Sequence, residues 1–532
     1  MTTQSDSRHL ARLARGGFAS VGGAGVSSVA GIALVAVVTN GFTQGRSGAL
    51  FATTALFMML ATLTQLGTEI GLVRTLPALT AGGRHADVGP VLRMALLPVL
   101  AVSTLVGAGL FLVSDEVAAL LVGADRAADG TLMLRCLAAF VPVNAVYTAV
   151  LAATRGLGTM RTTVLVDSIG RHALQPLAVL VVALSGGGAL ALVLAWVGPF
   201  IACFGFAVAS LAARLRSVRA RALAVPGGPT AASAKPALRR QFWGFTGPRI
   251  PATIAQVALK RLDIVLVSAL RSPEEAAVYT AATRFVVIGQ LGVQALQQAL
   301  GPQVSGLLSQ QQVSSAQRLF QTTTAWMMLF AWPIYLVCAV LCPWLLPLFG
   351  EGYTAGADVV VILSLSMLVA TASGSVDTVL LMSGRSVLSL VNNVSALVVN
   401  VGLNLLLIPP LGITGAAIAW SAAIVVRNVL PLVQIRRMLD MSPGGRGAAW
   451  VAMAALACFG AVPWTARGLG ASMEVVALVT VVLCAPAYAW LILRRRDSLE
   501  LTLMWASVTR RRRAADRTAP PAGVTAPQHA AP

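Results

Sequence analysis

Charged side chains are scarce in this chain of 532 residues, of which only 11% are Asp, Glu, Lys or Arg. A water-soluble protein would carry about 25%. A larger soluble core cannot account for the difference, because the surface must still face water. Hydrophobic residues make up 57% of the chain, and the mean hydropathy is +0.80. The shortage of charge excludes a soluble globular protein and predicts that lipid covers much of the surface.

Lysine is almost absent, with Lys235 and Lys260 the only two, so arginine carries most of the net charge of +20. Such a charge could indicate nucleic-acid binding. The arginines, however, lie in short clusters between apolar runs, which is typical of the cytoplasmic side of membrane proteins. We therefore expect no nucleic-acid partner.

Motifs for metal binding and nucleotide hydrolysis are also missing. All six cysteines fall in apolar runs without a C-x-x-C pair, and the four histidines lie elsewhere, so we interpret the cysteines as small buried residues and expect no metal. No G-x-x-x-x-G-K-[ST] loop is present, and no loop is long enough to form a catalytic domain. We expect no cofactor and no enzymatic activity; energy would come from an ion gradient, the membrane potential or substrate supply.

Apolar runs of about 20 residues recur along nearly the whole chain, and each can cross a hydrocarbon core of about 30 Å as a helix. They predict an all-α integral membrane protein with about fourteen transmembrane helices. The expected spans are 17–38, 48–72, 91–113, 132–153, 164–184, 189–213, 243–270, 277–306, 322–349, 357–382, 387–408, 413–435, 448–466 and 472–494.

The basic residues predict the orientation. With the N-terminus inside, about 28 of the 39 Lys and Arg fall in cytoplasmic segments and about 5 outside, and the outer loops instead hold acids such as Asp115 and Glu351. An even number of spans is needed for this, because an odd number would place one terminal basic cluster outside. We expect a multi-pass protein of the plasma (inner) membrane with both termini cytoplasmic.

A basic segment divides the chain into parts. We expect an N-terminal six-helix lobe over residues 1–213, a basic cytoplasmic linker over 214–241 and a C-terminal six-helix lobe over 242–435. Helices 13 and 14 follow over 436–496, and the Arg-, Ala- and Pro-rich segment 497–532 is predicted to be a disordered cytoplasmic tail.

An internal repeat supports the two lobes. Residues Ala49–Phe57 match Ala277–Phe285 at an offset of 228, with aromatic, small and Thr positions in register. The match predicts two lobes in the same orientation, related by a parallel pseudo-twofold axis along the membrane normal, as in many transporters. Coincidence in an Ala-, Thr- and Leu-rich sequence is the alternative.

Polar residues form stripes on two of the predicted helices. In span 243–270 they are spaced by four, three, four and three residues, which places them within about 80° of arc on a helix: Arg249, Thr253, Gln256, Lys260 and Asp263. Span 277–306 carries Thr280, Arg284, Gln294 and Gln298 on one face. Ionisable residues in a membrane usually face a cavity or one another, so these stripes predict a cationic, water-filled passage.

The candidate substrate-binding residues are therefore Arg284, Arg249, Lys260, Gln256, Gln294 and Gln298, with Arg284 first because no acid is nearby in its own helix. Other interpretations stay open: Lys260 could neutralise Asp263, and Arg249 and Arg427 could snorkel to the interface. The candidates for ion coupling are the intramembrane acids Glu69, Asp167, Asp263 and Asp377. For Asp167 we favour a plain pair with Arg171, four residues further on.

Several segments together resemble a known family. They are Lys260-Arg-Leu-Asp263, Glu275 to Arg284, Leu348 to Tyr353, Leu380 to Arg385 and Asn400 to Pro409. In order and spacing they are similar to the Wzx-type polysaccharide flippases of bacteria, in the multidrug/oligosaccharidyl-lipid/polysaccharide exporter superfamily. The N-terminal half matches less well, and the Arg-rich tail departs from the pattern.

The resemblance implies a central cavity between two lobes, alternating access, and transport of an undecaprenyl-diphosphate-linked glycan from the inner to the outer leaflet of a bacterial inner membrane. It implies a lipid-linked anionic oligosaccharide and membrane lipid as partners, and leaves other polysaccharide-assembly proteins open. The alternatives are a flippase for a lipid-linked peptidoglycan precursor and a multidrug or ion antiporter, which should favour acids in its cavity. A membrane-bound glycosyltransferase or polymerase is disfavoured because the loop Thr39–Ser47 carries no acid.

Overall fold

The computed structural model describes residues 22–23, 25–223, 235–247, 250–496 and 499–500. Nearly all of these residues are helical, and none of them forms a strand. Eleven helical stretches in this part of the chain are long and apolar enough to cross a membrane. The prediction of an all-α, multi-span membrane protein is thereby confirmed.

Helices of the first half pack mainly on one another, in the pairs α4 with α6, α6 with α8, and α2 with α6. We call them the N-terminal group. Their bounds are Gly25–Gly41, α2 Gln44–Thr64, α3 Thr68–Ala81, α4 Val88–Leu112, α5 Ser114–Val122, α6 Ala127–Gly156, η3 Thr163–Arg171, α7 His172–Leu184 and α8 Ala189–Leu223, with short 3-10 turns η1 His85–Asp87 and η2 Ala124–Arg126.

Helices of the second half form a C-terminal group, in which α11 packs on α12, α12 on α13 and α10 on α15. The helix α9 precedes this group in the chain but packs on α3 and α4 of the N-terminal group. Bounds are α9 Lys235–Thr246, α10 Ile250–Leu270, α11 Pro273–Ser309, α12 Val313–Leu345, η5 Leu346–Phe349, η6 Tyr353–Gly356, α13 Ala357–Ala372, α14 Val376–Met382 and α15 Ser386–Leu439.

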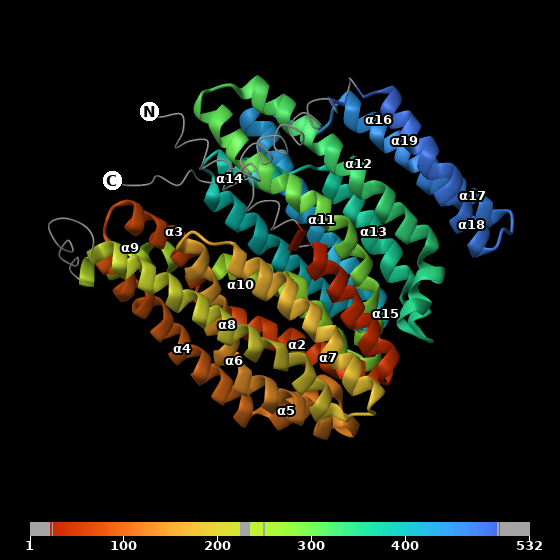
Figure 1. The fold of residues 1–532 in the computed structure, drawn as a ribbon. Helices are drawn as coiled ribbons and strands as arrows, with labels where there is room; N and C mark the ends of the chain where they lie inside the picture. Colours follow the sequence, from red (N-terminus) through yellow and green to blue (C-terminus); the bar gives the residue numbers. More distant parts are fainter. Residues whose placement is uncertain (1–21, 24, 224–234, 248–249, 497–498, 501–532) are drawn as a thin grey trace, which may run out of the picture.

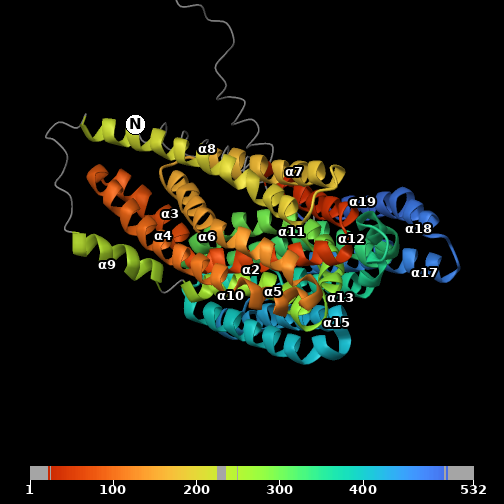
Figure 2. The same ribbon diagram turned by 90° about the horizontal axis from the view of Figure 1, so that it is seen from below.

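The last helices form an antiparallel pair interrupted by short π-helical stretches. This pair packs on α12, outside the C-terminal group, and lies away from the N-terminal group (Figures 1 and 2). Its parts are α16 Arg446–Ala455, η7 Leu456–Ala461, α17 Val462–Gly468, α18 Met473–Val479, η8 Thr480–Cys484 and α19 Ala485–Arg494.

Two of the predicted spans are interrupted by turns at glycine. Span 48–72 is divided by a turn in which Gly67 has φ +68°, and span 357–382 by a turn with Gly374 at φ +70°. In span 243–270 the structure describes α9 up to Thr246 and α10 from Ile250, and residues 248–249 lie outside the described part. The division predicted between spans 387–408 and 413–435 is present within α15, which joins two helices at Gly412, where φ is 57° and ψ is −135°. The number fourteen therefore stays a prediction.

The two groups meet along α2, which packs against both α10 and α11. Figure 1 shows them converging toward one end and diverging toward the end that carries α3 and α9. In the predicted topology, the converging end faces outside and the diverging end faces the cytoplasm. Division into two repeat-related lobes stays a prediction, although α2 and α11 begin with the same kind of cap, Thr43 and Ser272, 229 residues apart.

Polar contacts join the two groups at the predicted outer end. Arg126 forms an ion pair with Glu274, with Nη1 2.5 Å from Oε1. Ser268 donates a 2.7 Å hydrogen bond to the carbonyl of Leu121, and Asn40 donates one of 3.0 Å to the carbonyl of Leu348. The groups are thus held together at this end.

Candidate functional site

Two cavities lie on either side of the wall formed by α10 and α11. The first, of about 300 Å³, lies between the two groups and is lined by the helix Gly25–Gly41, α2, α7, α8, α10 and α11. The second, of about 270 Å³, lies inside the C-terminal group and is lined by α10, α11, α13 and α15. Arg261 and Arg284 line both cavities.

Positive side chains dominate these walls. Lys260 and Arg427 line the second cavity beside Arg261 and Arg284, and Arg171 lines the first. Adjacent residues on a helix point about 100° apart, so Lys260 and Arg261 can face different directions from α10. Against these five cations, Asp263 is the one carboxylate that lines either cavity among the described residues.

Arg284 lies on α11 at the junction of the two cavities. Its Nε donates a 3.3 Å hydrogen bond to the carbonyl of Thr280 one turn earlier, and no described carboxylate lies within ion-pair distance. A guanidinium group offers five donors, so most of those of Arg284 are available to a ligand.

Asp263 is buried, and its side chain accepts a hydrogen bond from a residue of the neighbouring helix α11. The hydroxyl of Tyr279 donates a 2.6 Å hydrogen bond to Oδ2, and the backbone amide of Ile264 donates one of 2.9 Å to Oδ1. Lys260 is exposed and forms no ion pair with Asp263. The interpretation that these two residues neutralise each other was wrong, because the carboxylate turns toward Tyr279.

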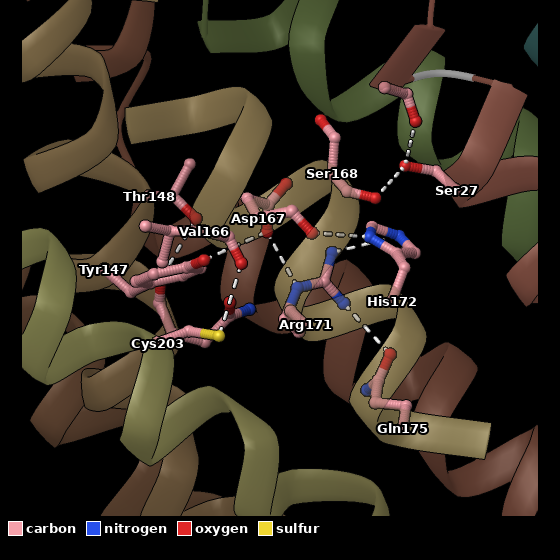
Figure 3. A network of polar contacts seen from close by, with 12 residues as sticks. Ser27, Tyr147, Thr148, Val166, Asp167, Ser168, Arg171, His172, Gln175 and Cys203 are labelled. Carbon is pink, nitrogen blue, oxygen red and sulfur yellow. Dashed lines mark hydrogen bonds and ion pairs between the residues drawn. The ribbon is translucent and has the colours of Figure 1, made fainter. Parts of the chain in front are cut away.

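The pair of Asp167 and Arg171 is confirmed, with Nε 2.7 Å from Oδ1. It belongs to a larger network in the N-terminal group (Figure 3). Tyr147 donates a 3.1 Å hydrogen bond to the same carboxylate oxygen, and the Arg171 guanidinium lies 4.6 Å from the centre of the Phe200 ring. His172 and Gln175 also contact Arg171.

The other ion-coupling candidates do not meet at one site. Glu69 pairs with Arg155 at 2.7 Å and lines, with Asp167, a third cavity of about 200 Å³ inside the N-terminal group. Asp377 lies in α14 and accepts a 2.5 Å hydrogen bond from the hydroxyl of Ser389. The structure thus brings Glu69 and Asp167 to one cavity and leaves Asp263 and Asp377 elsewhere.

Two of the predicted glutamines do not contribute to the described cavities. Gln256 and Gln294 are exposed and lie outside both linings. Gln298 lies in α11, but its side chain is outside the described part of the structure, as is the whole of Arg249.

Sequence reasoning missed Arg261, which shares both cavities with Arg284, and His172, which lines the first. Arg261 lies within the family-like segment Lys260-Arg-Leu-Asp263, and that resemblance was the available signal. No group of three or more His, Cys, Asp or Glu that could hold a metal ion occurs in the described residues.

Comparisons with known proteins agree with the fold. Residues 248–406 match the model of the MatE family. The lipid II flippase MurJ, in an inward closed conformation, gives a TM-score of 0.65 at 10% identity over 89% of this chain and 98% of its own. An inward-facing multidrug resistance MATE family transporter of the MOP superfamily gives 0.62 at 13% identity, over 81% and 95%.

A MOP superfamily transporter from Pyrococcus furiosus, described as having a binding pocket of reverse polarity, gives a TM-score of 0.52 at 15% identity over 85% and 96% of the two chains. Curated protein sequences contain no match. At these identities the solved structures establish the fold, which is that of MOP-superfamily transporters. The MatE match over residues 248–406 agrees with this fold.

Proposed function

We propose that this protein is a flippase that moves a lipid-linked anionic oligosaccharide, with an undecaprenyl-diphosphate carrier, from the inner to the outer leaflet of a bacterial inner membrane. The observation that carries the proposal is the pair Arg261 and Arg284, shared by two cavities in which five cations face one carboxylate. Ionisable groups at membrane depth are costly and usually mark a substrate or ion path.

The chemistry of these side chains fits a diphosphate. A diphosphate ester entering the protein must exchange its hydration for charged donors, and the planar guanidinium fork matches phosphate oxygens in a bidentate manner. Lys260 and Arg427 offer further positive charge from the second cavity. Trp420, on α15, lines the same cavity and offers an apolar face to a sugar ring.

The arrangement of the two groups supports alternating access. At the predicted outer end they are joined by the Arg126–Glu274 pair and by the Ser268 hydrogen bond. They diverge toward the opposite end (Figure 1). A cavity between groups closed at one end is suited to receive a headgroup from the cytoplasmic leaflet, while the lipid tail stays in the bilayer.

A flippase for a lipid-linked peptidoglycan precursor is the second candidate. The likeness to the lipid II flippase MurJ over 89% of this chain favours it, and its substrate class would present the same kind of anionic group to Arg261 and Arg284. A multidrug antiporter for cationic compounds is disfavoured, because the four cations other than Arg171, which is paired with Asp167, would repel such substrates.

The test uses the full chain in proteoliposomes with a fluorescent prenyl-diphosphate-linked trisaccharide. A membrane-impermeant quencher removes the fluorescence only of lipid in the outer leaflet of the liposome. We expect the protein to make the lipid of the inner leaflet accessible to this quencher. We expect no transport of an analogue in which a neutral linker replaces the diphosphate. Transport of both would contradict recognition of the anion, and transport of neither would contradict the proposal. Stronger competition by lipid II than by the unlabelled trisaccharide lipid would favour the second candidate.

A further inference from the structure

In η3, a π-helical stretch of the fifth predicted span, three consecutive carbonyls contact polar side chains. Within η3, the carbonyl of Val166 accepts from Cys203 at 3.3 Å and that of Ser168 from Ser27 at 2.8 Å. The carbonyl of Asp167, between them, lies 2.8 Å from Nδ1 of His172 (Figure 3). Single π-turns inside helices are frequent at functional sites.

The two partners of His172 define its protonation state. A carbonyl oxygen only accepts, so Nδ1 of His172 must carry the hydrogen of the bond to Asp167. Nη2 of Arg171 lies 3.1 Å from Nε2, and a guanidinium only donates, so Nε2 must present its lone pair. In this conformation the imidazole is therefore neutral, with its hydrogen on Nδ1.

The same contact holds Arg171 in place. Its Nε donates to Asp167, its Nη1 donates to Gln175 at 3.2 Å, and its Nη2 donates to His172. Arg171 and His172 nevertheless both line the cavity between the two groups. The guanidinium of Arg171 thus lies at the cavity wall, but its Nε, Nη1 and Nη2 each contact an acceptor within the protein.

The groups around His172 come from every helix packed against this site. They are Asp167 and Arg171 on its own helix, Tyr147 from α6, Cys203 from α8, and, on the cavity's other walls, Arg261 from α10 and Arg284 from α11. Asp167 is the acid among them, and Arg171 and Tyr147 already bind it. A bound anion would supply the missing negative charge.

We infer that His172 is a proton-binding site, at Nε2, that is coupled to anion binding in the cavity between the two groups. This inference rests on the proposed function, since the anion is the diphosphate of that substrate. A proton taken from water binds the Nε2 lone pair, and the neutral imidazole becomes imidazolium. Nη2 of Arg171 then loses its acceptor and becomes available to an anion in the cavity, while Nε stays paired with Asp167.

Coupling of this kind is reciprocal. If a proton on His172 strengthens anion binding, the bound anion strengthens proton binding by the same factor. Imidazole is the side chain that ordinarily changes charge between pH 5 and 8. Binding of the diphosphate is therefore expected to tighten as the pH falls through this range, and to be accompanied by proton uptake.

The first test needs no substrate. The chain has four histidines, so ¹⁵N-histidine labelling of the full protein in bilayers gives few signals, and His172→Gln assigns the one in question. We expect a neutral imidazole with an unprotonated Nε2 at pH 8 and a protonated fraction that grows as the pH falls to 5.5. A signal for His172 that stays in one state between these values, or that shows the hydrogen on Nε2 at pH 8, would overturn the inference.

The second test measures binding of a short-prenyl diphosphate monosaccharide, in which both phosphates are esterified and lack the second ionisation near pH 6. We expect affinity to rise about fivefold or more from pH 8 to pH 5.5, within the usual range of coupling between sites. This pH-dependent rise in affinity should vanish in His172→Gln. The glutamine amide keeps one hydrogen-bond donor and one acceptor but does not change charge with pH. His85→Gln, in η1 away from both cavities, is the matched control and should keep this rise.

The outcomes separate the two proposals. A wild-type protein that binds the probe equally at both pH values, or a His172→Gln variant that keeps the pH dependence, contradicts the coupling and leaves the flippase proposal standing. A wild-type protein that does not bind the probe at any pH contradicts the flippase proposal, and with it the coupling to that anion.

Discussion

The hydroxyl of Tyr279 lies 2.6 Å from Oδ2 of Asp263 and donates a hydrogen bond to it between two adjacent helices, α11 and α10. Both side chains are buried. The carboxylate thus lies at the wall of a cavity with Arg261 and Arg284, but is oriented by a neutral donor. This arrangement leaves the guanidinium groups open to a ligand while one negative charge remains close by.

Replacing Tyr279 with Phe removes one donor from a buried carboxylate. A hydrogen bond to a charged group contributes about 1.5–3 kcal/mol, so Tyr279→Phe should lower the melting temperature in detergent clearly. Tyr488→Phe is the matched control, because that hydroxyl donates to a neutral carbonyl, of Leu329, at 3.0 Å and such a bond contributes about 0.5–1.5 kcal/mol. Equal destabilisation by both changes would contradict a charged partner for Tyr279.

The ion pair between Arg126 and Glu274 should favour the conformation closed at the outer end. Both side chains are partly exposed, so the pair contributes only about 0–1 kcal/mol, and Arg126→Ala should raise the outward-open population by up to about fivefold. Spin labels at Ser185 and Thr354, one on each group at that end, would report the longer distance. The exchange of both residues, Arg126→Glu with Glu274→Arg, should restore the wild-type distribution; an unchanged distribution in Arg126→Ala would contradict the role.

Much of the fold could be predicted because lipid imposes a strong constraint. Each unpaired backbone group in hydrocarbon costs several kcal/mol, so long apolar runs must be helical, and hydropathy alone located them. The breaks at Gly67 and Gly374 could not be predicted, since glycine is also common inside membrane helices. Their position depends on packing against other helices, which local sequence does not encode.

The candidate site was predicted only in part. Arg284 and Lys260 line a cavity. This agrees with the rule that ionisable side chains within membrane helices face a cavity or one another. The stripe on α10 was a poor guide to the rest, since it omitted Arg261 and grouped the buried Asp263 with the exposed Gln256. Helical periodicity gives the angle between two side chains around the helix axis. It does not give which face of the helix packs against the neighbouring group.

The predicted topology can be tested at two described loops. Reporter fusions after Gln311, between α11 and α12, should read cytoplasmic, and fusions after Gly470, between α17 and α18, should read outside. The reason is the bias of Arg toward one side of the predicted spans. The same location for both fusions would contradict the fourteen-span arrangement, and reversed locations would contradict the orientation.

Arg284 is expected to contribute to substrate affinity, because it lines both cavities and pairs with no described carboxylate. A charge-assisted contact contributes roughly 1.5–3 kcal/mol, so Arg284→Ala should weaken diphosphate binding by about 10- to 150-fold. Arg284→Lys should recover only part of the affinity, because lysine keeps the charge but loses the bidentate fork.

The control for this experiment is Arg318→Ala, which removes the same side chain from an exposed position on α12, outside both cavities. It should leave binding and transport unchanged. Melting curves in detergent separate a binding role from a structural one: if Arg284 served only to stabilise the fold, Arg284→Ala would lower the melting temperature or the yield in proportion to the loss of transport. Full transport by Arg284→Ala at normal yield would rule out the binding role.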